Sequence, residues 1–274
     1  MKIVFANSSH VSAPERFVLR AGRWTRIPLK VRYGFIDHPK LGPVLIDTGY
    51  GPQVTNAGNR SAALRLYARV LNPKLVDDEQ PEPLLAHYGY GCGDVRFVII
   101  THFHADHVSH LGAFPNARFI ANTQAWRTIS RRSHMGNVAH GVFTELLPQD
   151  LEDRLVCTSS SDPVPAPLTL SEGADLFGDG SVLAIDLPGH ADGQFGVCFA
   201  TLDTPLLYAV DVEWHNTALL AGRSPGKPAS LITHNGEASR TSAAAVRRFK
   251  AAGGEILLCH DPSDSRFDHG AGDR

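Results

Sequence analysis

The chain has few cysteines and no excess of charge of either sign. It contains 4 cysteines in 274 residues, and they are scattered without any CxxC pair. This excludes a disulfide framework and a zinc cage built from thiolates. Lys and Arg number 26 against 28 Asp and Glu, which gives a formal net charge of −2. Such a balance offers no electrostatic attraction for nucleic acid, so we expect no nucleic-acid partner.

Long hydrophobic runs are also missing. The apolar run at residues 3–6 is shorter than the roughly 7–15 residues of a signal-peptide core. No stretch approaches the ~20 apolar residues that cross a membrane. Together with cysteines that suit a reducing compartment, these absences predict a cytoplasmic protein without a membrane partner.

Short apolar segments alternate with amphipathic ones along the whole chain, which predicts one α/β domain over residues 1–274. Residues 159–168 are loop-like and suggest an insertion or a lid, and the polar residues 263–274 suggest a frayed tail. Strands are expected within residues 31–47 (a hairpin), 97–101, 114–122, 181–190, 205–211 and 255–261, and helices at residues 59–75, 81–90, 123–132 and 239–254.

Histidine is the abundant residue, with 14 copies, and its densest cluster is the segment THFHADH. His102 and His104 follow a predicted buried strand, so in extended chain they point to the same side. Asp106 and His107 come as the chain turns and face a second point nearby. Imidazole and carboxylate groups bind zinc and similar divalent metals. The motif therefore predicts two metals about 3.5–4 Å apart.

Further ligands are needed, and three later strands supply them. His190, Asp211 and His260 each follow an apolar segment that would deliver the side chain to the same sheet edge. This recurrence argues against scattered surface or core histidines. The remaining histidines have no ligand spacing. His110 and His215 could meet substrate or lie at the cleft rim, and the others are expected on the surface or in packing: His10, His38, His87, His134, His140, His234 and His269.

These motifs resemble the metallo-β-lactamase-fold hydrolase superfamily. The matching segments are LIDTG (residues 45–49), THFHADH (101–107), LPGHADGQ (187–194), the strand ending at Asp211, and CHD (259–261). The resemblance implies a four-layer αββα sandwich with two divalent metals, zinc above all, while iron, manganese and cobalt stay open. It implies His102, His104 and His190 at the first metal, Asp106, His107 and His260 at the second, and Asp211 bridging.

Other residues are candidates for supporting roles. The resemblance implies that Asp47 lies near the metals without binding them, or Asp47 is a turn residue after its strand. Asp261 would orient a ligand imidazole. Phe103, Trp214 and His215 are the candidate substrate contacts. Gly189 and Gly193 would be needed for the backbone conformation of the loop that carries His190, and not for the chemistry.

Two positions narrow the branch. Residue 104 is His, whereas the diiron oxygen-reducing relatives have Glu there. Residue 211 is Asp, and no cysteine occupies a matching ligand position, which separates the chain from the lactamases with a cysteine ligand at the second metal. The segment from Ser109 to Trp126 is similar to the N-acyl-homoserine-lactonase-like branch. Two departures are Ser109-His110 in place of Gly-Gly, and Trp214 where those lactonases have a carbonyl-polarising Tyr. An indole donates a hydrogen bond but cannot act as a phenol does.

The implied reaction is hydrolysis by a water that bridges the two metals, attacking an ester or lactone. Asp106 would also shuttle a proton to the leaving group. Thioester hydrolysis, phosphodiester or phosphotriester hydrolysis, and a non-catalytic metal-binding scaffold remain alternatives. The expected partner is a small ester or lactone substrate, and a homodimer is left open.

Overall fold

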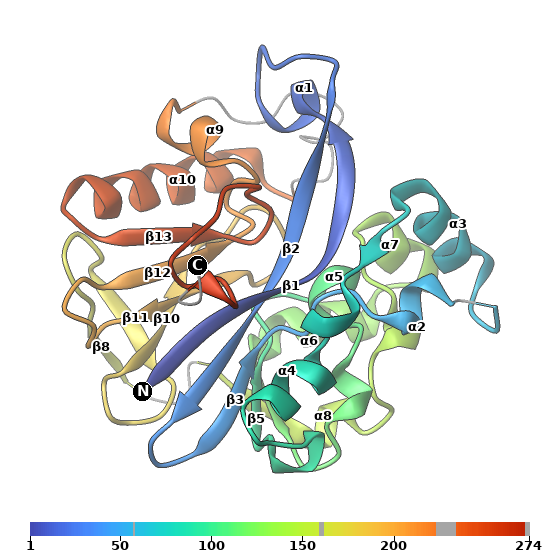
Figure 1. Ribbon diagram of the computed structural model, residues 1–274, viewed down its shortest axis with the longest axis horizontal. Coiled ribbons are helices and arrows are strands. Elements are labelled where there is room, and N and C mark those ends of the chain that lie inside the picture. The colour runs from blue at the N-terminus through green and yellow to red at the C-terminus, as the bar shows by residue number, and fades with distance from the viewer. Residues whose placement is uncertain (57, 159–161, 223–233, 272–274) are drawn as a thin grey trace.

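Two β-sheets face each other in the computed structural model, and helices cover their outer sides (Figure 1). The structure describes residues 1–274 except 57, 159–161, 223–233 and 272–274. This arrangement confirms the predicted αββα sandwich. No helix in the described part of the chain combines the length and the apolar character needed to cross a membrane.

The first sheet has seven strands, with parallel pairing from β3 through β5 and β6 to β7. Its two longest strands are β1 and β2, with 13 residues each, and they pair antiparallel. The sequence did not predict β1, because its polar stretch from Asn7 to His10 interrupts the apolar pattern. The strand order is β4 (Lys74–Leu75), β1 (Lys2–Pro14), β2 (Arg26–His38), β3 (Gly42–Ile46), β5 (Phe97–Ile99), β6 (Arg118–Ala121) and β7 (Leu155–Cys157).

The second sheet has six strands and is antiparallel except for the β12–β13 pair. Part of the predicted insertion at residues 159–168 forms its edge strand β8, whereas residues 159–161 lie outside the described chain. The order is β13 (Glu255–Leu258), β12 (Leu206–Val210), β11 (Phe195–Phe199), β10 (Val182–Asp186), β9 (Glu172–Asp175) and β8 (Pro163–Pro165).

Helices form where capping residues and apolar spacing agree. Ser61 caps α3 and accepts a hydrogen bond from the N–H of Leu64, so this helix begins later than the sequence suggested. Asn235, not a Ser or Thr, caps α10. The helices are α1 (Glu15–Val18), α2 (Pro52–Thr55), α3 (Ala62–Leu71), α4 (Pro81–His87), α5 (Ala105–Val108), α6 (Thr123–Arg131), α7 (His134–Ala139), α8 (Leu151–Arg154), α9 (Asn216–Leu220) and α10 (Gly236–Ala251), with single 3₁₀ turns η1 (Asp77–Glu79), η2 (Cys92–Asp94), η3 (Leu111–Ala113) and η4 (Thr144–Leu146).

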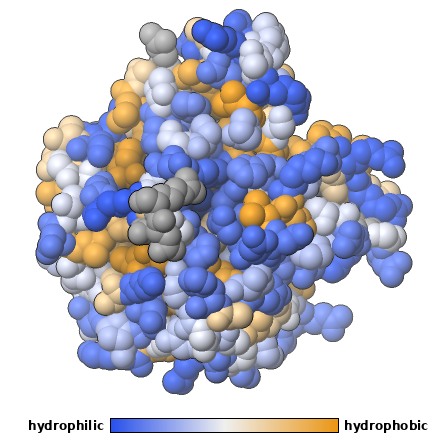
Figure 2. Space-filling model, in the orientation of Figure 1, coloured by the Kyte–Doolittle hydropathy of each residue, from blue (hydrophilic) through white to orange (hydrophobic). Residues whose placement is uncertain are grey.

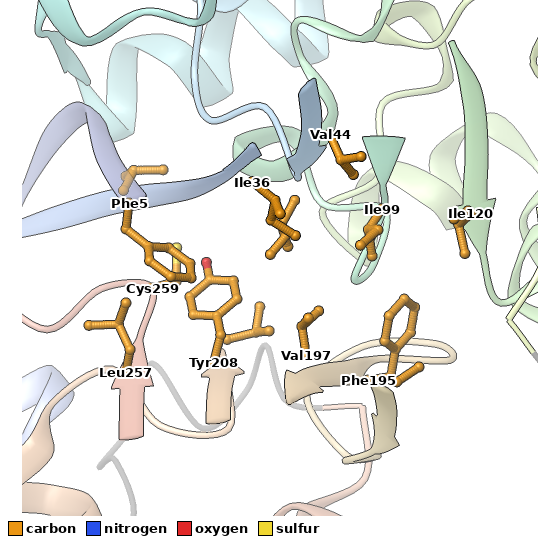
Figure 3. Close-up of a cluster of buried hydrophobic side chains, with 14 of the residues drawn as sticks. Phe5, Ile36, Val44, Ile99, Ile120, Phe195, Val197, Tyr208, Leu257 and Cys259 are labelled. Atoms are coloured by element: carbon orange, nitrogen blue, oxygen red, sulfur yellow. The ribbon is translucent and has the colours of Figure 1, made fainter. Parts of the chain in front are cut away.

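The main core fills the space between the sheets. Figure 3 shows Phe5, Ile36 and Ile99 of the first sheet pointing toward Val197 and Tyr208 of the second. Two further buried clusters lie on the outer faces, one against α4 and α6 and one against α10. Polar residues dominate the outer surface in the orientation of Figure 1, and hydrophobic ones lie there in separate small groups (Figure 2).

The tail is packed, contrary to the expectation of fraying. The backbone of Phe5 donates to the carbonyl of Phe267 over 2.7 Å and accepts from the N–H of His269 over 2.7 Å. The side chain of Phe267 packs on the core between the sheets. The last described residues therefore form part of the fold beside β1.

Candidate metal centre

The predicted ligands come from strand ends that meet at one edge of the sandwich. His102 and His104 follow β5, and Asp211 and His260 follow the parallel strands β12 and β13. His190 follows β10, which has the same direction as β12 because each is antiparallel to β11. Since strands of one direction end at the same sheet edge, these side chains converge. All of the predicted ligands are buried.

Three histidines form the first group. The ligand atoms of His102, His104 and His190 all lie within 4.8 Å of one another. Nε2 of His190 is 3.0 Å from Nδ1 of His104. Nε2 of His102 is buried and makes no hydrogen bond to any described residue. Three nitrogens thus face one point, which is the donor set and shape of a metal site.

The imidazoles of this group are held neutral. Burial, together with His107 and His104, lowers the pKa of His102 well below its usual value. Burial and the adjacent His190 lower the pKa of His104 to about 3. A metal ligand must be a deprotonated imidazole, so this group is ready to bind at neutral pH.

Asp47 orients one histidine of the second group of predicted ligands, which consists of Asp106, His107 and His260. His107 lies on α5, and its Nδ1 is 2.8 Å from the Asp47 carboxylate. The backbone N–H and hydroxyl of Thr101 also donate to Asp47, each over 2.8 Å. Nε2 of His107 is 3.6 Å from both Asp106 and Asp211. The structure therefore places Asp47 behind the site as a residue that orients His107, as the resemblance implied.

His260 is oriented in the same way by backbone. Its Nδ1 is 2.8 Å from the carbonyl oxygen of Lys30, which can only accept, so Nδ1 carries the proton. Nε2 then points at Asp106 and Asp211, at 3.3 Å and 3.2 Å. Burial alone would lower the pKa of His260, but Asp211 outweighs it and raises the pKa well above its usual value. The carboxylates therefore favour a positive charge at Nε2, which a metal cation would also supply.

The neighbouring histidines keep the two carboxylates, Asp106 and Asp211, in their charged form. Burial alone would raise the pKa of Asp106, but His107 and His260 outweigh it and lower the pKa to about 2. His260 and His107 likewise hold the pKa of Asp211 well below its usual range against the effect of burial. Both carboxylates are therefore charged at neutral pH and suited to a divalent cation.

The residues present fit a pair of metal ions. Nε2 of His107 and Oδ1 of Asp211 are buried without a hydrogen bond to any described residue, as is Nε2 of His102. Asp211 Oδ2 is 3.3 Å from His190 of the first group and 3.2 Å from His260 of the second. Asp211 therefore lies between the groups, where a bridging carboxylate is expected.

Backbone strain accompanies the site. Val210, directly before Asp211, has a φ of 52°, and Asp47 has a φ of 58°. A β-branched residue in this left-handed region is an outlier that costs of order 1–3 kcal/mol. Gly189, just before His190, has a φ of +133°, and an added Cβ would lie 2.2 Å from the backbone nitrogen of Ser239. This confirms the backbone requirement predicted for Gly189.

Phe103 and Trp214, the predicted substrate contacts, lie beside the predicted ligands. The Trp214 ring centroid lies 6.0 Å from that of His190 and 5.8 Å from that of His260. Phe103 is buried, with its ring 6.0 Å from Trp126. Trp214 thus spans both groups of ligands on one side.

His215 and Asp261 make local contacts that the sequence did not predict. Nδ1 of His215 accepts from the N–H of Thr217 and caps α9. The Asp261 carboxylate accepts from the backbone N–H groups of Asn216 and Ser263. Both side chains are engaged in holding the loop after β12 and the loop after β13. The described hydrogen bonds of Asp261 go to backbone groups, and its role in orienting a ligand imidazole stays a prediction.

Three residues near the candidate metal centre were not predicted as ligands or substrate contacts. Cys259, buried, belongs with His107, Asp211 and His260 to one group of ligand atoms within 4.8 Å. The only sequence signal for Cys259 was its place next to His260. His140 and His234 were assigned to the surface or packing, yet they line a small pocket at the first group, together with Phe103, His104, Ile129, Val142, His190, Ala191 and Asp192.

Comparison with known proteins gives three kinds of likeness. The sequence model described as "Metallo-beta-lactamase superfamily" matches residues 28–259. An N-acyl homoserine lactonase, AttM of Azorhizobium caulinodans, is 24% identical over 89% of this chain and 86% of its own. A solved N-acyl homoserine lactone hydrolase with its product N-hexanoyl-L-homoserine at the metal centre superposes with a TM-score of 0.71 at 18% identity, covering 95% of this chain and 93% of that one. The dizinc lactonase AidC superposes with a TM-score of 0.65 at 13% identity, covering 95% and 86%.

Proposed function

The chain belongs to the metallo-beta-lactamase superfamily, and on that premise we propose that it is a dinuclear metal hydrolase that opens a lactone or cleaves a related carboxylic ester. Its lactonase relatives and the match to the superfamily support a metal-dependent hydrolase. One observation carries the proposal furthest. The carboxylate of Asp211 lies 3.3 Å from His190 and 3.2 Å from His260, which joins two buried groups of ligand atoms.

Each metal ion would have its own set of ligands. His102, His104 and His190 would hold one ion, and Asp106, His107 and His260 the other, with Asp211 shared. When bound, a pair of divalent ions lowers the pKa of a water molecule and polarises a carbonyl group. Asp106 would also pass a proton to the leaving group, through the carboxylate oxygen that does not face His107 and His260.

Phe103 and Trp214 supply the apolar side of the substrate site. The lactonase relatives act on N-acyl homoserine lactones by name, and an acyl chain needs an apolar wall. Trp214 stands at the position of the lactonase tyrosine and offers an indole N–H as a donor. We infer that Trp214 both shields the reacting carbonyl from water and donates a hydrogen bond to the substrate.

Metal removal tests the proposal. We expect a chelator to abolish hydrolysis of a lactone, and added zinc or manganese to restore it, with two ions per chain by elemental analysis. A panel of lactones, esters, thioesters and phosphoesters separates the reaction classes. Preferred turnover of a thioester or phosphoester would replace the lactonase assignment, and two bound ions without turnover of any member would indicate a metal-binding scaffold.

Trp214→Ala should weaken substrate binding. Loss of a large apolar contact of about 1.5–3 kcal/mol corresponds to a KM raised about 10- to 100-fold, most strongly for long acyl chains. Trp24→Ala is the matched control, because Trp24 is 69% exposed. A KM unchanged in Trp214→Ala, or the same rise in both variants, would remove Trp214 from the substrate site.

A further inference from the structure

A buried arginine joins the two sheets beside His260. Arg32 lies on β2 and its side chain is fully buried. It donates to the carbonyl oxygens of Leu258 over 3.2 Å, Asp261 over 2.6 Å and Ser263 over 2.5 Å. These carbonyls precede and follow His260 along the chain, so one rigid guanidinium fixes the backbone on both sides of the ligand.

The neighbouring Lys30 completes the arrangement. Its carbonyl oxygen holds Nδ1 of His260. Its ammonium group contacts Asp268 at 3.0 Å. The same strand therefore sets both the backbone position and the ring orientation of His260.

Asp268 in the tail is the counter-ion of this arrangement. Its carboxylate binds Arg32 through two hydrogen bonds, 2.7 Å from Nε and 3.0 Å from Nη2, and its side chain is 15% exposed. A buried arginine that loses its partner is left as an uncompensated charge, and its hydrogen bonds to carbonyls are no longer pre-oriented. Asp268 lies beyond residue 259, where the match to the superfamily's sequence model ends.

We propose that the C-terminal segment is part of the metal centre, with Asp268 as a positioning residue that acts through Arg32 on His260 and so sets the affinity of the second metal ion. This inference rests on the metal site of the proposed function. Asp268 touches none of the predicted ligands in the described structure. Its effect must therefore pass through β2 and the loop after β13, while the first group of histidines, on the other side of Asp211, keeps its geometry.

The test compares two carboxylates of the same segment. Asp268→Asn removes the charge that faces Arg32, whereas Asp264→Asn removes a carboxylate that contacts the same Lys30 at 2.7 Å but is 71% exposed. We expect Asp268→Asn to bind the second zinc ion about 10- to 100-fold more weakly, the usual effect of losing an outer contact of a ligand. The first ion and both ions of Asp264→Asn should bind as in the unchanged protein.

Chelator competition measures both affinities without substrate, and the visible spectrum of the cobalt-loaded protein reports the ligand geometry. Thermal unfolding of the metal-free variants separates positioning from folding. Because Asp268→Asn could fail to fold, Arg32→Lys provides a second variant. It keeps the positive charge but loses the planar guanidinium group that donates to several carbonyl oxygens at once. Selective weakening of the second ion in Asp268→Asn, or in Arg32→Lys if Asp268→Asn does not fold, supports the inference.

Wild-type affinities and cobalt spectra in Asp268→Asn, or in Arg32→Lys if the first does not fold, would overturn it. Equal weakening of both ions would do the same, because it would indicate general loosening. Failure of the proposed function looks different: the unchanged protein would bind two ions and hydrolyse no ester, while the Asp268 effect on binding persisted.

Discussion

Asp211→Ala is expected to reduce both metal retention and hydrolysis by more than about 100-fold. Even outer contacts of metal ligands cost 10- to 100-fold, and Asp211 contacts both groups directly. Its Oδ2 lies 3.3 Å from His190 and 3.2 Å from His260, and its pKa is held well below the usual range by His260 and His107 despite burial. Without it, neither group keeps a shared carboxylate. Elemental analysis after dialysis and kcat/KM on the best substrate measure the effect.

Asp203→Ala is the matched control. Asp203 is exposed in the turn before the same strand, β12, so its removal should leave metal content and activity unchanged. Two firmly bound ions in Asp211→Ala would contradict the bridging role. Loss of activity with both ions retained would instead assign Asp211 to proton transfer.

Phe5→Ala should destabilise the fold by about 3–5 kcal/mol, the usual range for removing a buried phenylalanine. Phe5 is 1% exposed and extends from β1 into the space between the sheets. Its ring centroid lies 4.7 Å from that of Tyr208 and 6.4 Å from that of Phe199, both on the facing sheet. Figure 3 shows Phe5 beside Tyr208. The vacated volume is enclosed by two sheets, which limits how far the structure can relax to fill it.

Urea unfolding of the metal-free proteins gives the free energy of unfolding directly. Leu66→Ala serves as the comparison, because Leu66 on α3 is 62% exposed and surface changes usually stay within about 0.5 kcal/mol. A loss below about 1 kcal/mol in Phe5→Ala would mean that the sheets close over the gap. It would show that the contacts of β1 with β2 and with the tail, not the packing between sheets, stabilise the first strand.

The limits of sequence interpretation appear in particular residues. His215 and Asp261 stand next to predicted site residues, and neighbourhood alone assigned them to the site. In the structure, His215 caps α9 and Asp261 accepts from two backbone N–H groups. Short polar side chains near loops often satisfy local backbone groups, so adjacency in sequence did not establish a role. The tail was misjudged for a related reason, since a polar Gly/Asp-rich composition conceals the packing of Phe267.

The sequence by itself predicted an α/β domain and the candidate ligands of the metal centre, because both depend on local rules, whereas the αββα sandwich was implied by the resemblance of its motifs to the superfamily. Apolar segments of strand length each end in a histidine or an aspartate, and side chains alternate along an extended chain. Residues such as His102, His190 and His260 can be found in this way one strand at a time.

Only the tertiary structure decided how these residues are held. Arg32 and Asp268 are 236 positions apart, and nothing local marks either as part of a metal centre. Lys30 contributes a backbone carbonyl to His260, a contact that no side-chain pattern records. Such pairings exist only after the two sheets have packed and the tail has closed beside β1, because the fold alone brings these distant charges and backbone groups within hydrogen-bonding distance.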